Sequence, residues 1–114
     1  NFHDYEYSDT RVGYVAYVPP GSIARGAVIA TQGNGSAASC GSCHGTKLDG
    51  QTIPGIGVVP PLAGRSPTYI ARELILFREG RRSDPAAAPM RAEASQLSVP
   101  EMIDVAAYAA SRKP

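Results

Sequence analysis

The sequence predicts an all-α domain in which three main helices are joined by long loops rich in proline and glycine. Apolar residues recur at helical spacing in three separate stretches, whereas no stretch gives an obvious sheet. The 114 residues include 12 glycines and 10 prolines, a composition that favours irregular connections. The length fits one domain, although a chain this small can only partly fill a core by itself.

The first helix is expected at about residues 23–32. Ser22 is a suitable N-cap residue, and Gly33 is a suitable stop. One face of this helix carries Ile23, Ala27 and Ala30. Residues 1–21, which end at Pro19-Pro20-Gly21, are expected to be irregular or extended.

The second helix is expected from Ser66 to about Glu79. Ser66 is a cap residue, Pro67 suits the first helical position, and Gly80 suits the end. Apolar residues follow at positions i, i+4 and i+7, namely Ile70, Leu74 and Phe77.

The third helix is expected at about residues 99–112. Ser98 and Glu101 have the spacing of a capping box. The buried stripe of this helix is expected to consist of Met102, Val105, Ala106 and Ala109. Residues 46–65 and 81–97 carry the prolines and glycines typical of loops, so both segments are interpreted as loops.

Two segments differ in composition. Residues 1–21 are aromatic and acidic and are interpreted as an N-terminal extension or linker, whereas residues 22–114 form the domain itself. The sequence begins at Asn1 without an initiator methionine or an apolar signal segment, so we expect a processed or trimmed product.

The charge and the hydropathy of the sequence argue against nucleic-acid binding and against a membrane span. The formal net charge is +1, which does not indicate nucleic-acid binding. The longest apolar stretches fall far short of the roughly 20 residues that a membrane span needs. We therefore expect neither a nucleic-acid partner nor a membrane span in this segment.

The only two cysteines lie in the motif Cys40-Gly41-Ser42-Cys43-His44. This C-x-x-C-H pattern is the attachment signature of a c-type haem. Two thiols three positions apart can bond to the two vinyl groups of one porphyrin, and the following histidine can bind the iron. The sequence therefore predicts one covalent haem c, held by Cys40 and Cys43, with His44 as an iron ligand.

Three other uses of the motif fit the sequence less well. A thioredoxin-like centre needs a preceding strand and an α/β pattern, but a Gly/Ser-rich segment precedes Cys40. A zinc site needs four ligands, and the other histidine is the distant His3. A structural disulfide would explain neither the spacing nor His44.

A low-spin electron-transfer haem also needs a sixth ligand, for which the candidates are His3, Met90 and Met102. Met102 falls in the apolar stripe of the last helix and is interpreted as a core residue. Met90 follows Pro89, which restricts the backbone, and lies away from any helical stripe. Met90 is therefore the predicted second iron ligand.

The order of these motifs resembles that of class I c-type cytochromes, including small bacterial monohaem proteins and single haem domains of dihaem or multidomain cytochromes. The resemblance spans about residues 22–114. It is carried by the haem motif, Pro60-Pro61-Leu62-Ala63-Gly64-Arg65-Ser66, Tyr69, Pro89-Met90 and the helix through Tyr108. It implies the class I cytochrome c fold around one covalent haem.

The resemblance also implies roles for individual residues. The Pro60 carbonyl would accept a hydrogen bond from the His44 ring, and Leu62 would pack on the haem face. Arg65 and Tyr69 would be partners of the haem propionates. Gly26 would lie where the first and last helices cross, with Tyr108 supplying the aromatic ring.

The function that the resemblance implies is single-electron transfer by a protein that is not an enzyme. An electron-entry domain of a larger oxidoreductase is the alternative, and a ligand-sensing or peroxidatic haem is a third possibility. Redox proteins would dock transiently at the exposed haem edge, inside an apolar ring formed by Ile53, Ile56, Val58 and residues 86–88. The expected compartment is the bacterial periplasm.

Overall fold

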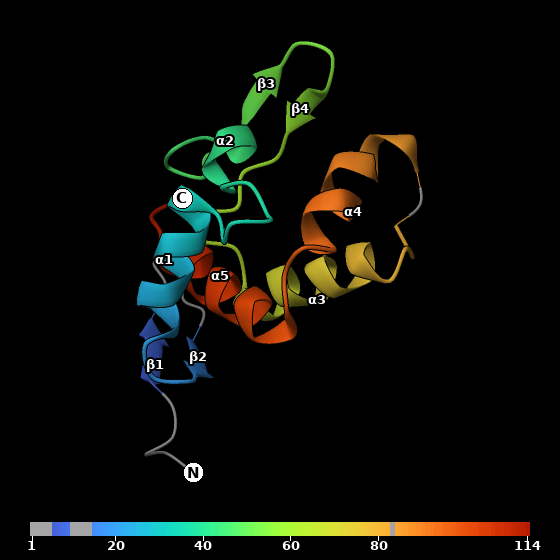
Figure 1. The fold of residues 1–114 in the computed structure, drawn as a ribbon. Helices are drawn as coiled ribbons and strands as arrows, with labels where there is room; N and C mark the ends of the chain where they lie inside the picture. The colour runs from blue at the N-terminus through green and yellow to red at the C-terminus, as the bar shows by residue number, and fades with distance from the viewer. Residues whose placement is uncertain (1–5, 10–14, 83) are drawn as a thin grey trace.

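The computed structural model describes residues 6–9, 15–82 and 84–114 (Figure 1). Within these residues the chain forms five α-helices and two separate antiparallel hairpins. His3 lies outside the described residues. None of the described helices combines the length and apolar character needed to cross a membrane.

The three predicted helices are confirmed. They are α1 (Ser22–Gln32), α3 (Pro67–Arg78) and α5 (Val99–Ser111). Helix α5 packs against both α1 and α3, so it runs through the centre of the fold (Figure 1). Gly33 caps the end of α1, as expected.

Two predicted N-caps are confirmed and one is wrong. The Ser66 side chain accepts a hydrogen bond from the Tyr69 N–H, and Ser98 and Glu101 form the complete capping box. Ser22, however, is the first residue of α1 and is fully buried, while Gly21 occupies the N-cap with φ of 82°. The Ser22 hydroxyl instead accepts a hydrogen bond from the Arg25 guanidinium.

The prediction of a loop over residues 81–97 is wrong. This segment contains the short 3-10 helix η2 (Pro85–Ala87) and helix α4 (Ala88–Ala94), which carries Met90. Both prolines of the segment, Pro85 and Pro89, lie in the first turn of their helix. The N–H groups of the first turn have no partner within the helix, so a proline, which lacks this group, loses no hydrogen bond there. It can therefore begin a helix instead of breaking one.

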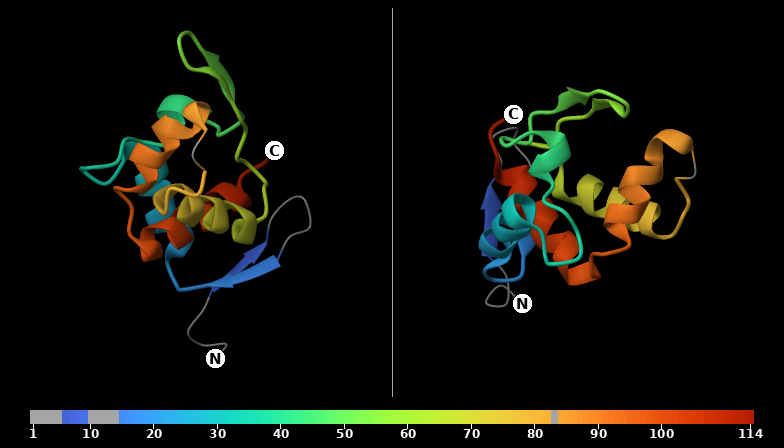
Figure 2. Two further views of the ribbon diagram at one scale, coloured as in Figure 1. Left: turned by 90° about the vertical axis from the view of Figure 1, so that its right-hand side faces the viewer. Right: turned by 45° about the horizontal axis from the view of Figure 1, so that its top comes forward.

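The expectation that the fold lacks a sheet is also wrong. Strands β1 (Glu6–Asp9) and β2 (Val15–Val18) form one hairpin, and β3 (Gln51–Ile53) and β4 (Gly57–Val59) form the other. The two hairpins lie at opposite ends of the molecule (Figure 2). Strands of three or four residues are too short to give a clear period-2 pattern, and Gly55 and Gly57 supply the positive φ angles of the second turn.

The core is formed mainly by the inner faces of α1, α3, α4 and α5. Met102 is completely buried in α5, which confirms that it is a core residue. The other large members of this cluster are Ile29, Leu48, Ile70, Leu74, Leu97 and Val105. Leu62, Phe77, Met90 and Tyr108 pack against the cluster while remaining partly exposed.

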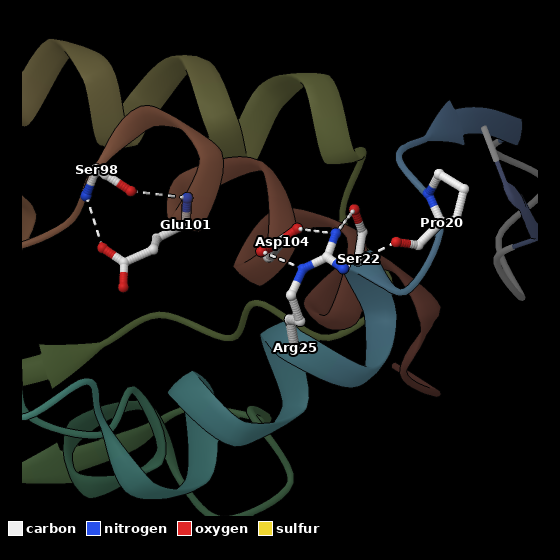
Figure 3. A network of polar contacts seen from close by, with 6 residues as sticks. All are labelled: Pro20, Ser22, Arg25, Ser98, Glu101 and Asp104. Atoms are coloured by element: carbon white, nitrogen blue, oxygen red, sulfur yellow. Dashed lines mark hydrogen bonds and ion pairs between the residues drawn. The ribbon is translucent and has the colours of Figure 1, made fainter. Parts of the chain in front are cut away.

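A partly buried ion pair joins α1 to α5 (Figure 3). Arg25 Nε lies 3.0 Å from Asp104 Oδ2, and Arg25 Nη1 donates to the Pro20 carbonyl over 2.8 Å. The Asp104 side chain is nearly buried, so an unpaired carboxylate there would be costly. The contact also fixes the turn through which the β1–β2 hairpin joins α1.

The crossing of α1 and α5 at Gly26 leads to the first prediction. A Cβ atom at Gly26 would lie 2.0 Å from the Asp104 carbonyl oxygen and 2.9 Å from the Tyr108 Cβ. Gly26→Ala should therefore lower the free energy of unfolding by about 3 kcal/mol, although alanine is the better helix former by about 1 kcal/mol. Guanidinium unfolding of the haem-loaded protein measures this effect.

The matched control is Ala24→Gly, at an exposed position of the same helix. It should cost about 1 kcal/mol through helix propensity alone. A Gly26→Ala protein as stable as wild type would contradict the close crossing.

The capping box leads to a prediction about pH. Glu101 Oε1 accepts from the Ser98 N–H over 2.9 Å, and both carboxylate oxygens accept from the Asn34 amide over 3.1–3.2 Å. These hydrogen bonds hold the pKa of Glu101 below its ordinary value of 4.5. Because the folded-state pKa is lowered, the stabilisation is complete above pH 4.5 and is lost as the pH falls through the folded-state value.

Glu101→Gln should therefore be less stable than wild type by a constant margin above about pH 5.5. That margin should shrink below pH 4.5, where wild type loses the ionised carboxylate. Denaturant titrations at a series of pH values measure the margin. A margin that stays constant down to pH 3 would show that the charge of Glu101 is not involved.

Candidate haem site

The two cysteines lie on one helical turn. Helix α2 (Gly41–His44) begins after Cys40, and the His44 N–H donates to the Cys40 carbonyl over 2.9 Å. Side chains three positions apart on such a turn point to the same side. The thiols of Cys40 and Cys43 are free and partly exposed, as two attachment points for one porphyrin would require.

The ring of His44 is fixed by one hydrogen bond. Its Nδ1 atom lies 2.7 Å from the Pro60 carbonyl oxygen, which can only accept. Nδ1 therefore carries the proton, and Nε2 is left with the lone pair that a metal ion requires. This contact was expected from the resemblance.

Burial lowers the pKa of His44, and the hydrogen bond to Pro60 opposes this effect only in part. The side chain is 5% exposed. The imidazole is therefore neutral near pH 7, which is the form that can bind iron.

The loop after the motif holds Pro60 in place. The Leu48 carbonyl accepts from the Leu62 N–H over 2.8 Å and from the Ala63 N–H over 2.9 Å. Leu48 has φ of 56°, which few residues other than glycine adopt, and its side chain is buried in the core. Sequence analysis missed Leu48, because nothing in the local pattern marks a leucine in this conformation.

A second contact missed by sequence analysis joins the β3–β4 hairpin to α2. The Gln51 amide donates to the Cys43 carbonyl over 2.8 Å and to the Ser42 carbonyl over 3.2 Å. Carbonyls near a helix C-terminus lack partners within the helix, and Gln51 supplies them. Strand β3 therefore supports the turn that presents the cysteines.

Cys40 lies in a largely apolar environment. Burial, followed by the nearby negative charge of Glu93, raises the pKa of Cys40 to about 11. The thiol therefore stays protonated at neutral pH. A thioether carries no charge, so an apolar position of this kind suits the attached form.

Met90 and the attachment turn belong to different parts of the fold. Helix α2 packs against α1 and β3, whereas α4 packs against α3. In both Figures 1 and 2, α2 and α4 lie on the same side of α3 and α5, facing each other. The partly exposed Met90 side chain packs against the core cluster. Iron ligation by Met90 stays a prediction.

The remaining predicted contacts are Leu62, Arg65 and Tyr69, near the start of α3. Leu62 is half-buried against the core, while Arg65 and Tyr69 are exposed. Their roles as propionate partners stay predictions. Taken together, a histidine with a free Nε2, two thiols on one turn and a partly buried methionine fit a covalently attached haem.

Comparison with known proteins identifies the family. Residues 23–113 match the family described as Cytochrome c. The chain is 37% identical to cytochrome c-554(548) of Halomonas halodenitrificans, over 74% of this chain and 96% of that protein. It is 41% identical to the thiosulfate dehydrogenase electron acceptor of Stutzerimonas stutzeri, over 74% of this chain but only 37% of that protein.

The fold is similar to that of solved cytochromes. The reduced recombinant cytochrome c4 of Pseudomonas stutzeri aligns with a TM-score of 0.70 and 25% identity, covering 82% of this chain and 50% of that one. This chain therefore belongs to the cytochrome c family and has the class I fold. Members of the family are electron carriers with covalent haem c and iron, not enzymes, and Cys40 and Cys43 fit the attachment motif.

Proposed function

We propose that residues 22–114 form a haem domain that carries single electrons in the bacterial periplasm, with His44 and Met90 as the two iron ligands. The hydrogen bond between His44 Nδ1 and the Pro60 carbonyl is the observation that carries this proposal. It leaves Nε2 as the only ring nitrogen able to bind a metal. Residues 1–21 are assigned to an extension of this domain.

The residues of the chain hold both ligands in place. The Pro60 carbonyl orients the imidazole and makes it a stronger donor. A methionine sulfur favours the reduced state of iron, so the His/Met pair raises the reduction potential. When bound, the haem supplies an iron that takes up and releases one electron. Because His44 is buried and Met90 packs against the core, we expect the protein to move little when the charge of the site changes.

The first test exchanges each methionine for leucine, which has a similar volume. Met90→Leu should abolish the weak far-red absorption band of ferric haem bound to methionine sulfur. It should also let the ferrous protein bind carbon monoxide at neutral pH. Absorption spectra measure both changes.

Met102→Leu is the matched control, because Met102 is fully buried in α5. It should keep the band, lower stability by less than about 1.5 kcal/mol, and still exclude carbon monoxide. If wild type lacks the band or binds carbon monoxide readily, the electron-carrier proposal fails. A ligand-sensing or peroxidatic role would then be favoured.

An electron-entry domain of a larger oxidoreductase is the second candidate function. The chain spans 37% of the thiosulfate dehydrogenase electron acceptor and half of the cytochrome c4 chain. Domains of this kind therefore occur within longer proteins. The chemistry at the haem would be the same, and the partner would belong to the same protein.

The proposed docking surface would surround the edge of the haem, and the residues predicted to form it are apolar. Val58 is 82% exposed and Ile56 is 50% exposed, both in the β3–β4 hairpin. In the η2–α4 segment Ala86 and Ala88 are exposed, whereas Ala87 is buried. Small apolar surfaces suit the transient contacts of redox proteins.

Electron self-exchange between ferric and ferrous copies tests this surface. Val58→Asp should slow self-exchange about tenfold, because two like charges would meet when the hairpins approach. Val28→Asp is the matched control, since Val28 is 51% exposed on α1, and it should change the rate less than twofold. Line broadening in NMR spectra of mixed oxidation states gives the rates.

High salt should restore most of the rate of Val58→Asp and hardly affect wild type. Equal rates for the two variants would contradict docking through the β3–β4 hairpin. A wild-type rate that changes by orders of magnitude with salt would instead indicate a charged interface.

A further inference from the structure

The geometry points to Glu93 as a positioning residue. Its carboxylate connects the helix that carries Met90 to the loop that precedes Cys40, and it would place a negative charge near the haem. Glu93 thus helps to hold Met90 near the iron and to set the reduction potential. The inference rests on the proposed ligation by Met90.

The connection is a hydrogen bond between residues that are 55 positions apart in the sequence. The Ala38 N–H donates to Glu93 Oε1 over 3.1 Å. Glu93 follows Met90 by one helical turn of α4, and Ala38 precedes Cys40 by two residues. One side-chain contact therefore links the predicted second iron ligand to the covalent attachment point.

The loop at residues 33–39 depends on side chains for its hydrogen bonds. Asn34 Oδ1 accepts from the Ser36 N–H over 2.9 Å and from the Ala37 N–H over 2.6 Å. Glu93 takes the next N–H along, that of Ala38. The Asn34 amide also donates to the Gln96 carbonyl, just beyond the end of α4, over 3.0 Å. Loss of the Glu93 contact would leave the end of the loop nearest Cys40 without its link to α4.

The charge of Glu93 is poorly compensated. In the described part of the chain Glu93 forms no ion pair. The nearest cation on α4, Arg91, donates to the Arg82 carbonyl over 2.7 Å and to the Asp84 carbonyl over 3.0 Å. The loop at residues 33–39 carries no ionisable side chain.

Partial burial strengthens the field of this carboxylate. Burial raises the pKa of Glu93, and the hydrogen bond from Ala38 opposes that rise. The same carboxylate contributes to the raised pKa of Cys40. A negative charge at this position stabilises the ferric state, which is more positive by one unit.

Two substitutions separate the hydrogen bond from the charge. Glu93→Gln keeps an oxygen acceptor of the same length and removes the charge, whereas Glu93→Asp keeps the charge on a side chain one methylene shorter. Glu79→Gln is the control, because Glu79 is an exposed carboxylate paired with Arg81 outside the site. All variants are studied as the haem-loaded protein.

Glu93→Asp should increase the rate of carbon monoxide binding to the ferrous protein about tenfold, since Met90 dissociates more readily. It should change the reduction potential little. Glu93→Gln should leave carbon monoxide binding within twofold of wild type. It should raise the ratio of reduced to oxidised protein at a fixed solution potential about threefold, which is about 30 mV for one electron. Glu79→Gln should change neither property.

The outcomes are distinguishable. A wild type with the far-red band, combined with Glu93 variants that match Glu79→Gln in both measurements, overturns the role of Glu93 and leaves Met90 ligation intact. A wild type without the band overturns both proposals. A shift in reduction potential for Glu93→Asp as large as that for Glu93→Gln would also contradict the inference, because Glu93→Asp keeps the negative charge.

Discussion

The hydrogen bond from His44 Nδ1 to the Pro60 carbonyl is the contact on which the site depends. It determines which ring nitrogen is free, and it requires a loop of 15 residues to bring Pro60 back over α2. That loop turns at Leu48, whose carbonyl accepts from the Leu62 and Ala63 N–H groups. Just beyond Pro60, the Gly64 N–H donates to the Ala109 carbonyl of α5 over 3.0 Å. The orientation of one imidazole is thereby linked to the central helix of the fold.

The two sides of the site are held in different ways. On the histidine side, attachment through Cys40 and Cys43 is covalent, and Gln51 and Pro60 support the same turn. On the side of Met90, the proposed second iron ligand, α4 is held by packing against α3, by the carboxylate of Glu93 and by Arg91, which donates to the Arg82 and Asp84 carbonyls. Noncovalent contacts of this size open far more readily than covalent bonds, so any exchange of an iron ligand should begin at α4.

Local signals in the sequence predicted the three long helices well. Ser66 with Pro67, and Ser98 with Glu101, are short-range signals that act within one turn, and the structure confirms both. The haem motif is equally local. Pro85 and Pro89 led to the wrong prediction of a loop. A proline in the first turn of a helix cannot be told from a proline within a loop by the local sequence alone. Ser22 failed as a cap because its hydroxyl is used by Arg25, in a network completed by Asp104, 79 positions away in the sequence.

The contacts that sequence reasoning missed are made by side chains outside the haem motif. Gln51, Asn34 and Glu93 bind backbone groups of residues 36–43, and none of the three belongs to a motif. Only Glu93 does so from a distant position in the sequence. Replacing them would leave the helices, the core and the haem linkage in place. Replacing Glu93 would remove a link between the loop before Cys40 and the helix that carries Met90, the proposed second iron ligand. A firm closure keeps the iron six-coordinate and suits electron transfer, whereas a loose one opens a position for ligands. With the proposed ligation by Met90, supporting side chains such as Glu93 would therefore influence which of these functions the site serves, alongside the residues that bind the haem.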